Sequence, residues 1–174
     1  MKSAGSPPIV GFIGFSGSGK TTLLKNLIVL LCRQQLSIGL IKTTHHDFEI
    51  DIPGKDSYDL RKAGATQVLL ASPKRTALIS EYRDNSSEPE LPILLSKLDT
   101  TTLDLVLVEG MKHAAIPKME IHRTEHSKSW LFPELANVIA VASDAIPPTP
   151  HPRLLPLNDI DAIANFVIEQ FIRT

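Results

Sequence analysis

Glycines, a lysine and a threonine stand at a spacing suited to holding phosphate, in the pattern Gly14-x-x-x-x-Gly19-Lys20-Thr21. Backbone N–H groups can close around phosphate oxygens where Cβ atoms are absent, as at Gly14, Gly17 and Gly19. The Lys20 ammonium can reach the β- and γ-phosphates of a nucleotide, and the Thr21 hydroxyl can ligate Mg²⁺. The pattern therefore predicts a site for a nucleoside triphosphate and magnesium.

The segments on either side of this loop support the prediction, because the motif requires a strand before it and a helix after it. The apolar run from Ile9 to Phe15 predicts the strand. The helix is indicated by apolar residues on one face, which are Leu23, Leu24, Leu27, Ile28 and Leu31. We therefore assign nucleotide binding to Gly14, Ser16, Gly17, Ser18, Gly19, Lys20, Thr21 and Thr22, and name Lys20 as a catalytic candidate as well.

Glu109 is the candidate for a second magnesium ligand beside Thr21. It ends the apolar run from Leu103 to Gly110, and an acidic residue at such a strand end supports the metal in phosphate-loop proteins. Asp104 opens the same run and would lie about 16 Å away by the rise per residue of a strand. We therefore prefer Glu109 to Asp104, and the glycine that follows it allows a sharp turn beside a ligand.

Polar residues also follow the second apolar run, Ser37 to Thr43. Asp47 or Asp51 could join the magnesium shell or orient an attacking water, and we name Asp47 as the second catalytic candidate. Lys42 or Lys55 could offset the charge of the phosphates. This segment is expected near the triphosphate, because ligands of parallel sheets bind at the carboxyl ends of the strands.

Two adjacent histidines, His45 and His46, raise the question of a transition-metal site, which His113 could approach in space. Two adjacent side chains rarely chelate one ion, and no spaced Cys/His partners follow them. A solvent-exposed loop is therefore the favoured interpretation of this pair.

Asp144 is the candidate for recognising the base. The Asn-Lys-x-Asp motif by which many GTPases read guanine is absent, and Asp144 ends the run from Val138 to Ala142, in the nearest equivalent position. A carboxylate there could accept hydrogen bonds from guanine N1–H and the 2-amino group. An equally weighted interpretation is that Asp144 caps a turn.

An α/β fold would bring these groups together. We expect a P-loop NTPase with a mostly parallel sheet, helices on both faces, and some outer or antiparallel strands. The predicted strands are 9–15, 37–43, 67–71, 76–82, 103–110, 118–123 and 137–142, and the predicted helices after the first are 56–65, 93–98 and one from 158 or 159. We place strand 118–123 outside the centre of the sheet and strand 37–43 away from its edge. Asp56 or Ser57 is expected to cap its helix, and residues 147–152 are expected to form a surface loop.

Length and composition indicate one domain over residues 1–174, with residues 1–8 flexible. The net charge of −1 gives no general attraction to nucleic acid or to a membrane, so neither is expected as a partner. The single cysteine, Cys32, cannot form an internal disulfide, and no apolar run reaches membrane-spanning length. We therefore expect a cytoplasmic protein.

Taken together, these segments closely resemble the molybdopterin-guanine dinucleotide biosynthesis adaptor protein B (MobB) family. The phosphate loop alone would place the chain only among P-loop NTPases. The more specific features are 39–42 leading into His-His-Asp, the Pro-Gly-Lys-Asp-Ser run 53–57, the run 60–65, 103–110 with Lys112 and His113, and 138–144. Family members often have a histidine at the position of Thr43, so no role of that histidine is carried over. Some wider relatives have a lysine at the position of Phe15, so no lysine from a partner subunit is assumed either.

The resemblance implies a homodimer that binds GTP and Mg²⁺ and has weak GTPase activity at most. It implies a role in assisting the molybdenum cofactor guanylyltransferase (MobA), which joins GMP to molybdopterin, and it makes a molybdopterin-type cofactor a further candidate ligand. Two alternatives stay open, a metallochaperone GTPase for nickel enzymes and a small-molecule kinase or ligase. The first lacks a His-rich tract and paired cysteines. The second would need several arginines in a lid, whereas Arg61, Arg75, Arg83 and Arg123 are scattered along the sequence.

Overall fold

The computed structural model describes residues 6–44, 48–82, 89–126, 129–148 and 150–173. The chain divides into two compact units. Residues 1–43 and 90–174 form the first unit, which contains the phosphate loop, and residues 44–89 form the second. Each unit is described by itself below.

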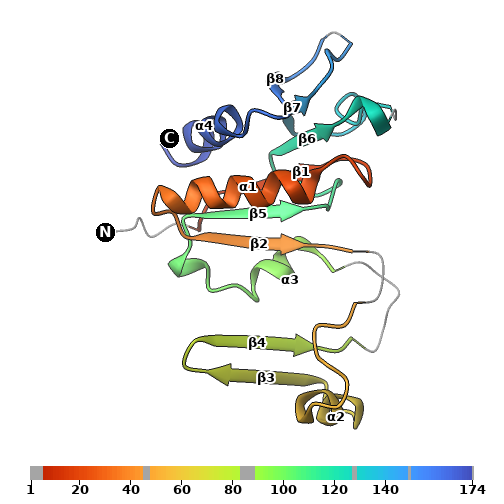
Figure 1. Cartoon of the computed structure of the whole chain (residues 1–174), viewed down its shortest axis with the longest axis vertical. Helices are drawn as coiled ribbons and strands as arrows, with labels where there is room; N and C mark the ends of the chain where they lie inside the picture. The colour runs from red at the N-terminus through yellow and green to blue at the C-terminus, as the bar shows by residue number, and fades with distance from the viewer. Residues whose placement is uncertain (1–5, 45–47, 83–88, 127–128, 149, 174) are drawn as a thin grey trace. The chain divides into compact units, whose positions relative to one another are not determined.

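A six-stranded parallel sheet forms the centre of the first unit (Figure 1). Its strands follow the order β2-β5-β1-β6-β7-β8, and every neighbouring pair is parallel. Their bounds are β1 (Ile9–Ile13), β2 (Ile38–Lys42), β5 (Leu105–Glu109), β6 (Lys118–His122), β7 (Val138–Ser143) and β8 (Arg153–Pro156). The predicted α/β class with a parallel sheet is confirmed.

Helices cover both faces of this sheet, as predicted. On one face α1 (Lys20–Arg33) and α4 (Ile160–Phe171) pack against each other and against Leu105 and Leu107 of β5. On the other face the short α3 (Leu91–Leu95) contributes Leu91 to a smaller cluster with Val106 and Val108. Successive residues of β5 therefore enter opposite cores, which explains why this strand is apolar without interruption.

Two predicted strand positions are wrong. β2 has only β5 as a neighbour among the described residues, so it lies at the edge of the sheet. Only one face of β2 packs on the core, since Ile41 is buried whereas Leu40 is 43% exposed. β6, expected as an outer strand, lies between β1 and β7, and all five of its residues are buried.

Polar residues are tolerated inside β6 because backbone groups of neighbouring loops satisfy them. The Lys118 ammonium donates to the carbonyl oxygens of Ala114 and Ile116, at 2.6 and 3.2 Å. The Glu120 carboxylate accepts from the N–H groups of Leu131 and Phe132, at 2.9 and 2.8 Å. The alternation of polar and apolar residues therefore does not mark an exposed face here.

Other boundaries differ in detail. β1 ends at Ile13, two residues before the predicted end, because the loop begins at Gly14. β8 was not predicted as a strand; it pairs with β7 at the sheet edge, a position that tolerates Pro156. The predicted start of the last helix is confirmed, since Asp159 accepts from the N–H of Ala162 at 2.9 Å. The described part of 147–152 is irregular, as expected.

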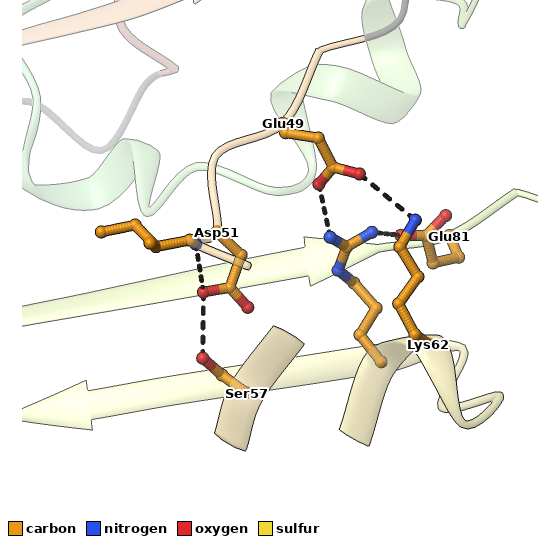
Figure 2. Close-up of polar contacts among 7 residues, drawn as sticks. Glu49, Asp51, Ser57, Lys62 and Glu81 are labelled. Atoms are coloured by element: carbon orange, nitrogen blue, oxygen red, sulfur yellow. Dashed lines mark hydrogen bonds and ion pairs between the residues drawn. The ribbon is translucent and has the colours of Figure 1, made fainter. Parts of the chain in front are cut away.

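The second unit consists of α2 (Asp56–Lys62) and an antiparallel hairpin of β3 (Gln67–Ser72) and β4 (Arg75–Ser80). The N-cap of α2 is Lys55, not Asp56 or Ser57 as predicted. The Ser57 hydroxyl instead donates to Asp51 Oδ1 at 3.0 Å, a contact drawn in Figure 2. This bond ties the segment before α2 to the first turn of the helix.

The guanidinium of Arg61 links three parts of the second unit. Arg61 extends from α2, is 8% exposed, and donates to Glu49 and to Glu81, the latter at 2.5 Å. Lys62 adds a second contact to Glu49 at 3.2 Å, and this hydrogen bond holds the pKa of Glu49 below its ordinary value (Figure 2). The segment before α2 and the end of the hairpin are thereby joined to the helix.

Candidate functional site

The loop between β1 and α1 has the backbone conformation that its glycines predict. Gly14, Gly17 and Gly19 all have positive φ values, of 153°, 83° and 93°. A Cβ on Gly14 would also collide with the carbonyl oxygen of Ile121 in β6. A side chain at this position would therefore force the loop away from the sheet.

The N-terminus of α1 has the features of an anion site. Gly19 is its N-cap, no side chain caps it, and no acidic residue lies in its first turn. In contrast, the N-terminus of α4 in the same unit is capped by the carboxylate of Asp159. The first N–H groups and the positive end of the helix dipole at α1 are thus directed to the loop, where an anion would be stabilised.

Lys20 lies over the loop. Its ammonium donates to the carbonyl oxygens of Gly14 and Phe15, both at 2.8 Å. Burial lowers the pKa of Lys20, an effect that Glu109 opposes and Lys42 reinforces. A partly desolvated cation held over glycine-rich backbone is well suited to bind phosphate oxygens.

Thr21, Glu109 and Lys42 meet at the carboxyl end of β5 and β2. The Thr21 hydroxyl donates to Glu109 Oε1 at 2.9 Å. The Lys42 ammonium lies 3.2 Å from Thr21 Oγ1 and 3.1 Å from Glu109 Oε2. A hydroxyl and a carboxylate therefore converge on one position, and a cation already contacts both.

Of the two acidic candidates at β5, Glu109 is the one that lies beside the loop. Asp104 lies before β5, where its Oδ2 accepts from the N–H of Ser37 at 2.8 Å, at the end of the strand away from the loop. Gly110 has the predicted tight turn after Glu109, with a φ of 99°. A Cβ there would lie 2.5 Å from the Thr43 hydroxyl, so this position also requires glycine.

Asp144 directly follows β7 at the same end of the sheet. Its Oδ1 accepts from the N–H and the hydroxyl of Thr124, at 2.9 and 2.8 Å. These bonds hold its pKa below the ordinary value. Asp144 therefore holds the short 3-10 turn Thr124–His126 after β6, which is the capping role considered from the sequence. It also lines an open hollow of about 320 Å³ with Ile146, Pro156 and neighbouring residues of β7 and β8.

Some predicted residues lie outside the described part of the first unit. His45, His46 and Asp47 lie outside the described residues. Asp51 and Lys55 belong to the second unit. Across the described ranges, no group of three or more His, Cys, Asp or Glu side chains could hold a metal ion.

Two residues that the sequence analysis did not assign to the loop lie beside it. The ring of His126 comes within 3.1 Å of the place that a Cβ on Gly17 would occupy. Arg123 Nη2 is 3.5 Å from the corresponding place on Gly19. Both follow β6 at its carboxyl end, and the incorrect outer placement of this strand is why they were missed.

Within the described chain, no helix is long and apolar enough to cross a membrane.

Comparison with known proteins agrees with this arrangement. A sequence profile described as "MobB: Molybdopterin guanine dinucleotide synthesis protein B" matches residues 9–144. The chain is 49% identical to the "Molybdopterin-guanine dinucleotide biosynthesis adapter protein" of Escherichia coli strain K12, over 93% of this chain and 92% of that protein. This chain belongs to the MobB family. The stretch matched by the profile runs from the first residue of β1 to Asp144 and so contains every candidate residue named above.

A second relative and a solved structure extend the comparison. The protein of the same name from Haemophilus influenzae is 39% identical over 92% of this chain and 87% of that protein. The crystal structure of Bacillus subtilis MobB matches with a TM-score of 0.73 and 26% identity, covering 94% of this chain and 98% of that one. Both matches cover nearly the full length of the chain, so the family assignment applies to both units.

Proposed function

We propose that this chain is an adapter protein of molybdopterin-guanine dinucleotide biosynthesis that binds GTP with Mg²⁺ at the loop between β1 and α1. The observation that carries the proposal is the convergence of Lys20, Thr21 and Glu109 around an uncapped helix N-terminus, in a chain 49% identical to an adapter of that pathway. The loop supplies phosphate binding, and the family membership supplies the pathway.

The donor set at Thr21 and Glu109 fits magnesium. Hydroxyl and carboxylate oxygens are the ligands that Mg²⁺ prefers, and it is bound with substrate phosphates rather than in a cage made wholly of protein groups. The contact of the Lys42 ammonium with both oxygens supports a preference for positive charge at this position. When bound, the metal would neutralise charge on the β- and γ-phosphates.

Asp144 is the proposed base-reading residue. A carboxylate can accept from two guanine donors, N1–H and the 2-amino group, and adenine lacks this pair. The lowered pKa of Asp144 keeps it ionised, and the adjacent hollow between β7 and β8 has apolar walls for the faces of a base. Oδ1 of Asp144 already accepts two hydrogen bonds from Thr124. Guanine would therefore bind to a carboxylate that also holds the turn beginning at Thr124.

Slow hydrolysis is part of the proposal. Thr21 contacts the side chains of Glu109 and Lys42, which are paired with each other. Neither side chain is therefore free to act as a general base on a water molecule. Asp47 remains the proposed water-orienting residue, and a GTPase without an arginine finger on the γ-phosphate is slow.

The second unit is the proposed assembly region. Its hairpin exposes several large apolar side chains, of which Leu69 is 67% and Leu78 49% exposed, and these two face each other across the strands. A second copy of this chain is the proposed occupant of this surface, giving a homodimer. The guanylyltransferase that attaches GMP to molybdopterin is the proposed partner, molybdopterin itself is a further proposed ligand, and the cytoplasm is the proposed compartment.

The test is co-purification of the chain with the guanylyltransferase, with and without GTP and Mg²⁺. We expect a complex, together with a higher yield of guanine dinucleotide cofactor when the wild-type chain is added. Neither a complex nor a higher yield under any of these conditions would overturn the adapter role. The variant Val29→Asp, altered on the exposed face of α1, serves as a control for nonspecific association.

A further inference from the structure

The segment that follows β6 brings a cation and an imidazole to the phosphate loop. Arg123 Nη2 and Nε lie 3.5 and 3.9 Å from the position of a Cβ on Gly19, the N-cap of α1. The Cε1, Nε2 and Nδ1 atoms of the His126 ring lie 3.1, 3.3 and 3.4 Å from the corresponding position on Gly17. These two glycines therefore have side chains from β6 and its following turn as direct neighbours.

This segment reaches the loop from the side opposite to the proposed metal site. In the sheet, β5 and β6 are the two neighbours of β1. β5 ends in Glu109, which contacts Thr21, whereas Arg123 directly follows β6. A metal held by Thr21 and Glu109 would neutralise charge on the terminal phosphates at the β5 side, so the rest of the nucleotide would lead away from that side. It would then pass the β6 side, and β7 with Asp144 lies next along the sheet.

A buried hydroxyl gives an independent indication of a ligand here. Ser18 is 2% exposed, and in the described part of the chain its Oγ has no hydrogen-bond partner. It lines one small hollow together with Phe15, Ile121, His122, Arg123 and His126. Buried polar groups are nearly always hydrogen-bonded in native proteins, so an unpaired hydroxyl beside a guanidinium indicates a group that binds there.

Arg123 lies beside the loop at Gly19, and its charge also acts on Asp144. The positive charge of Arg123 contributes to lowering the pKa of Asp144, after the larger effect of the bonds from Thr124. Asp144 in turn holds the 3-10 turn that begins directly after Arg123. The carboxylate that we propose to read the base therefore holds the turn that follows Arg123.

We propose that Arg123 binds the α-phosphate of the nucleotide, with the His126 ring packed on Gly17 as the adjoining wall and the Ser18 hydroxyl as a further donor. The proposal rests on the proposed function, since it needs a nucleotide in the loop. Arg123 then binds a group that GDP and GTP share. It is a nucleotide-binding residue on the side of the ribose, and not a finger on the γ-phosphate.

Calorimetric titration of GTP and GDP with Mg²⁺ into the wild type, Arg123→Gln and Arg123→Lys tests the proposal. Arg75→Gln, at the exposed start of β4 in the hairpin, is the matched control. A charged hydrogen bond corresponds to roughly ten- to a hundredfold in affinity. We expect Arg123→Gln to weaken both nucleotides by that factor and to leave the ratio of the two affinities unchanged. Arg123→Lys should recover part of the loss.

Three results separate the possibilities. Unchanged affinities in Arg123→Gln would overturn the proposal. A loss of affinity confined to GTP would overturn it in favour of a contact with the γ-phosphate. A wild type that binds neither nucleotide would instead overturn the proposed function itself. Unchanged thermal unfolding of both variants shows that the affinities report on contacts rather than on folding.

Discussion

All five residues of β5 in the first unit are buried, whereas five of the six residues of β3 in the second unit are exposed. The two strands are similarly apolar, with the sequences Leu-Val-Leu-Val-Glu and Gln-Val-Leu-Leu-Ala-Ser. β5 has helices and loops on both faces, and β3 belongs to a two-stranded hairpin. The same kind of residue therefore stabilises a core in one unit and forms a surface in the other.

This difference assigns separate tasks to the two units. The buried strands of the first unit fix the positions of the phosphate loop and Glu109, which form the proposed binding site. A lone hairpin is marginally stable in water, and large exposed apolar areas mark interaction surfaces. We therefore expect changes in the first unit to alter nucleotide binding, and changes in the second to alter assembly.

The largest expected effect is at Lys20. Lys20→Ala should weaken GTP binding at least roughly a hundredfold, because it removes charged contacts to the phosphates. Its fold should stay intact, since the ammonium is held only by two loop carbonyls in the described structure. Calorimetry measures the affinity, with Lys25→Ala on the exposed face of α1 as the control. Equal affinities in Lys20→Ala and the wild type would remove the phosphate-binding role from this loop.

Leu69 tests the second unit. Leu69→Asp places a charge on the exposed apolar surface of the hairpin, which should raise the dissociation constant of the homodimer at least roughly tenfold. GTP affinity should remain within about twofold of the wild type. Light scattering across a concentration series measures the assembly, with Val29→Asp as control. A dimer that persists unchanged in Leu69→Asp would show that another surface joins the copies.

Glu109 tests the proposed metal site. Glu109→Gln removes one charged ligand and the ion pair with Lys42, so the gain in GTP affinity on adding Mg²⁺ should fall by about tenfold. Binding measured in the presence of a chelator should change much less. Asp104→Asn, at the other end of β5, is the matched control. An undiminished magnesium effect in Glu109→Gln would place the metal elsewhere.

The smallest expected effect is a difference in pH response between the units. Burial raises the pKa of Glu120 above its ordinary 4.5, although its two backbone bonds and His122 oppose this, so the first unit should gain stability as the pH falls from 7 toward 4.5. The lowered pKa of Glu49 stabilises the second unit above pH 4.5, and this contribution is lost as the pH falls further.

Hydrogen exchange resolved by residue, expressed as protection factors, measures both responses. Amides of β6 report on the first unit and amides of β3 and β4 on the second. In Glu49→Gln the second unit should no longer lose stability as the pH falls below 4.5. A parallel fall in the protection factors of both units from pH 7 downward would contradict the effects assigned to Glu120 and Glu49.

The sequence predicts the conformation and position of the loop well because local features determine them. Positive-φ glycines, the lysine after them and the apolar helix behind them all lie within about twenty residues, and the acidic end of β5 follows from burial on both faces. β6 was misplaced because its polar residues are satisfied by backbone groups of loops 114–116 and 131–132, which are contacts that no periodicity reveals. Arg123 was missed as a direct consequence.

Edge positions were equally hard to predict. The middle of β2 is apolar because one of its faces packs on the core, and this pattern does not show whether a further strand pairs with it. The capping of α2 also escaped prediction, since the Ser57 hydroxyl donates to Asp51 instead of accepting from the helix. In these cases the outcome depends on which tertiary partner is available.

Calorimetric titration of the unmodified chain with GTP and, separately, with ATP in Mg²⁺ tests the central claim most directly. The account predicts saturable binding of one GTP per chain, and binding of ATP weaker by about tenfold or more, since adenine lacks the pair of donors that Asp144 would accept from. Binding of neither nucleotide would contradict the claim that the loop between β1 and α1 holds GTP.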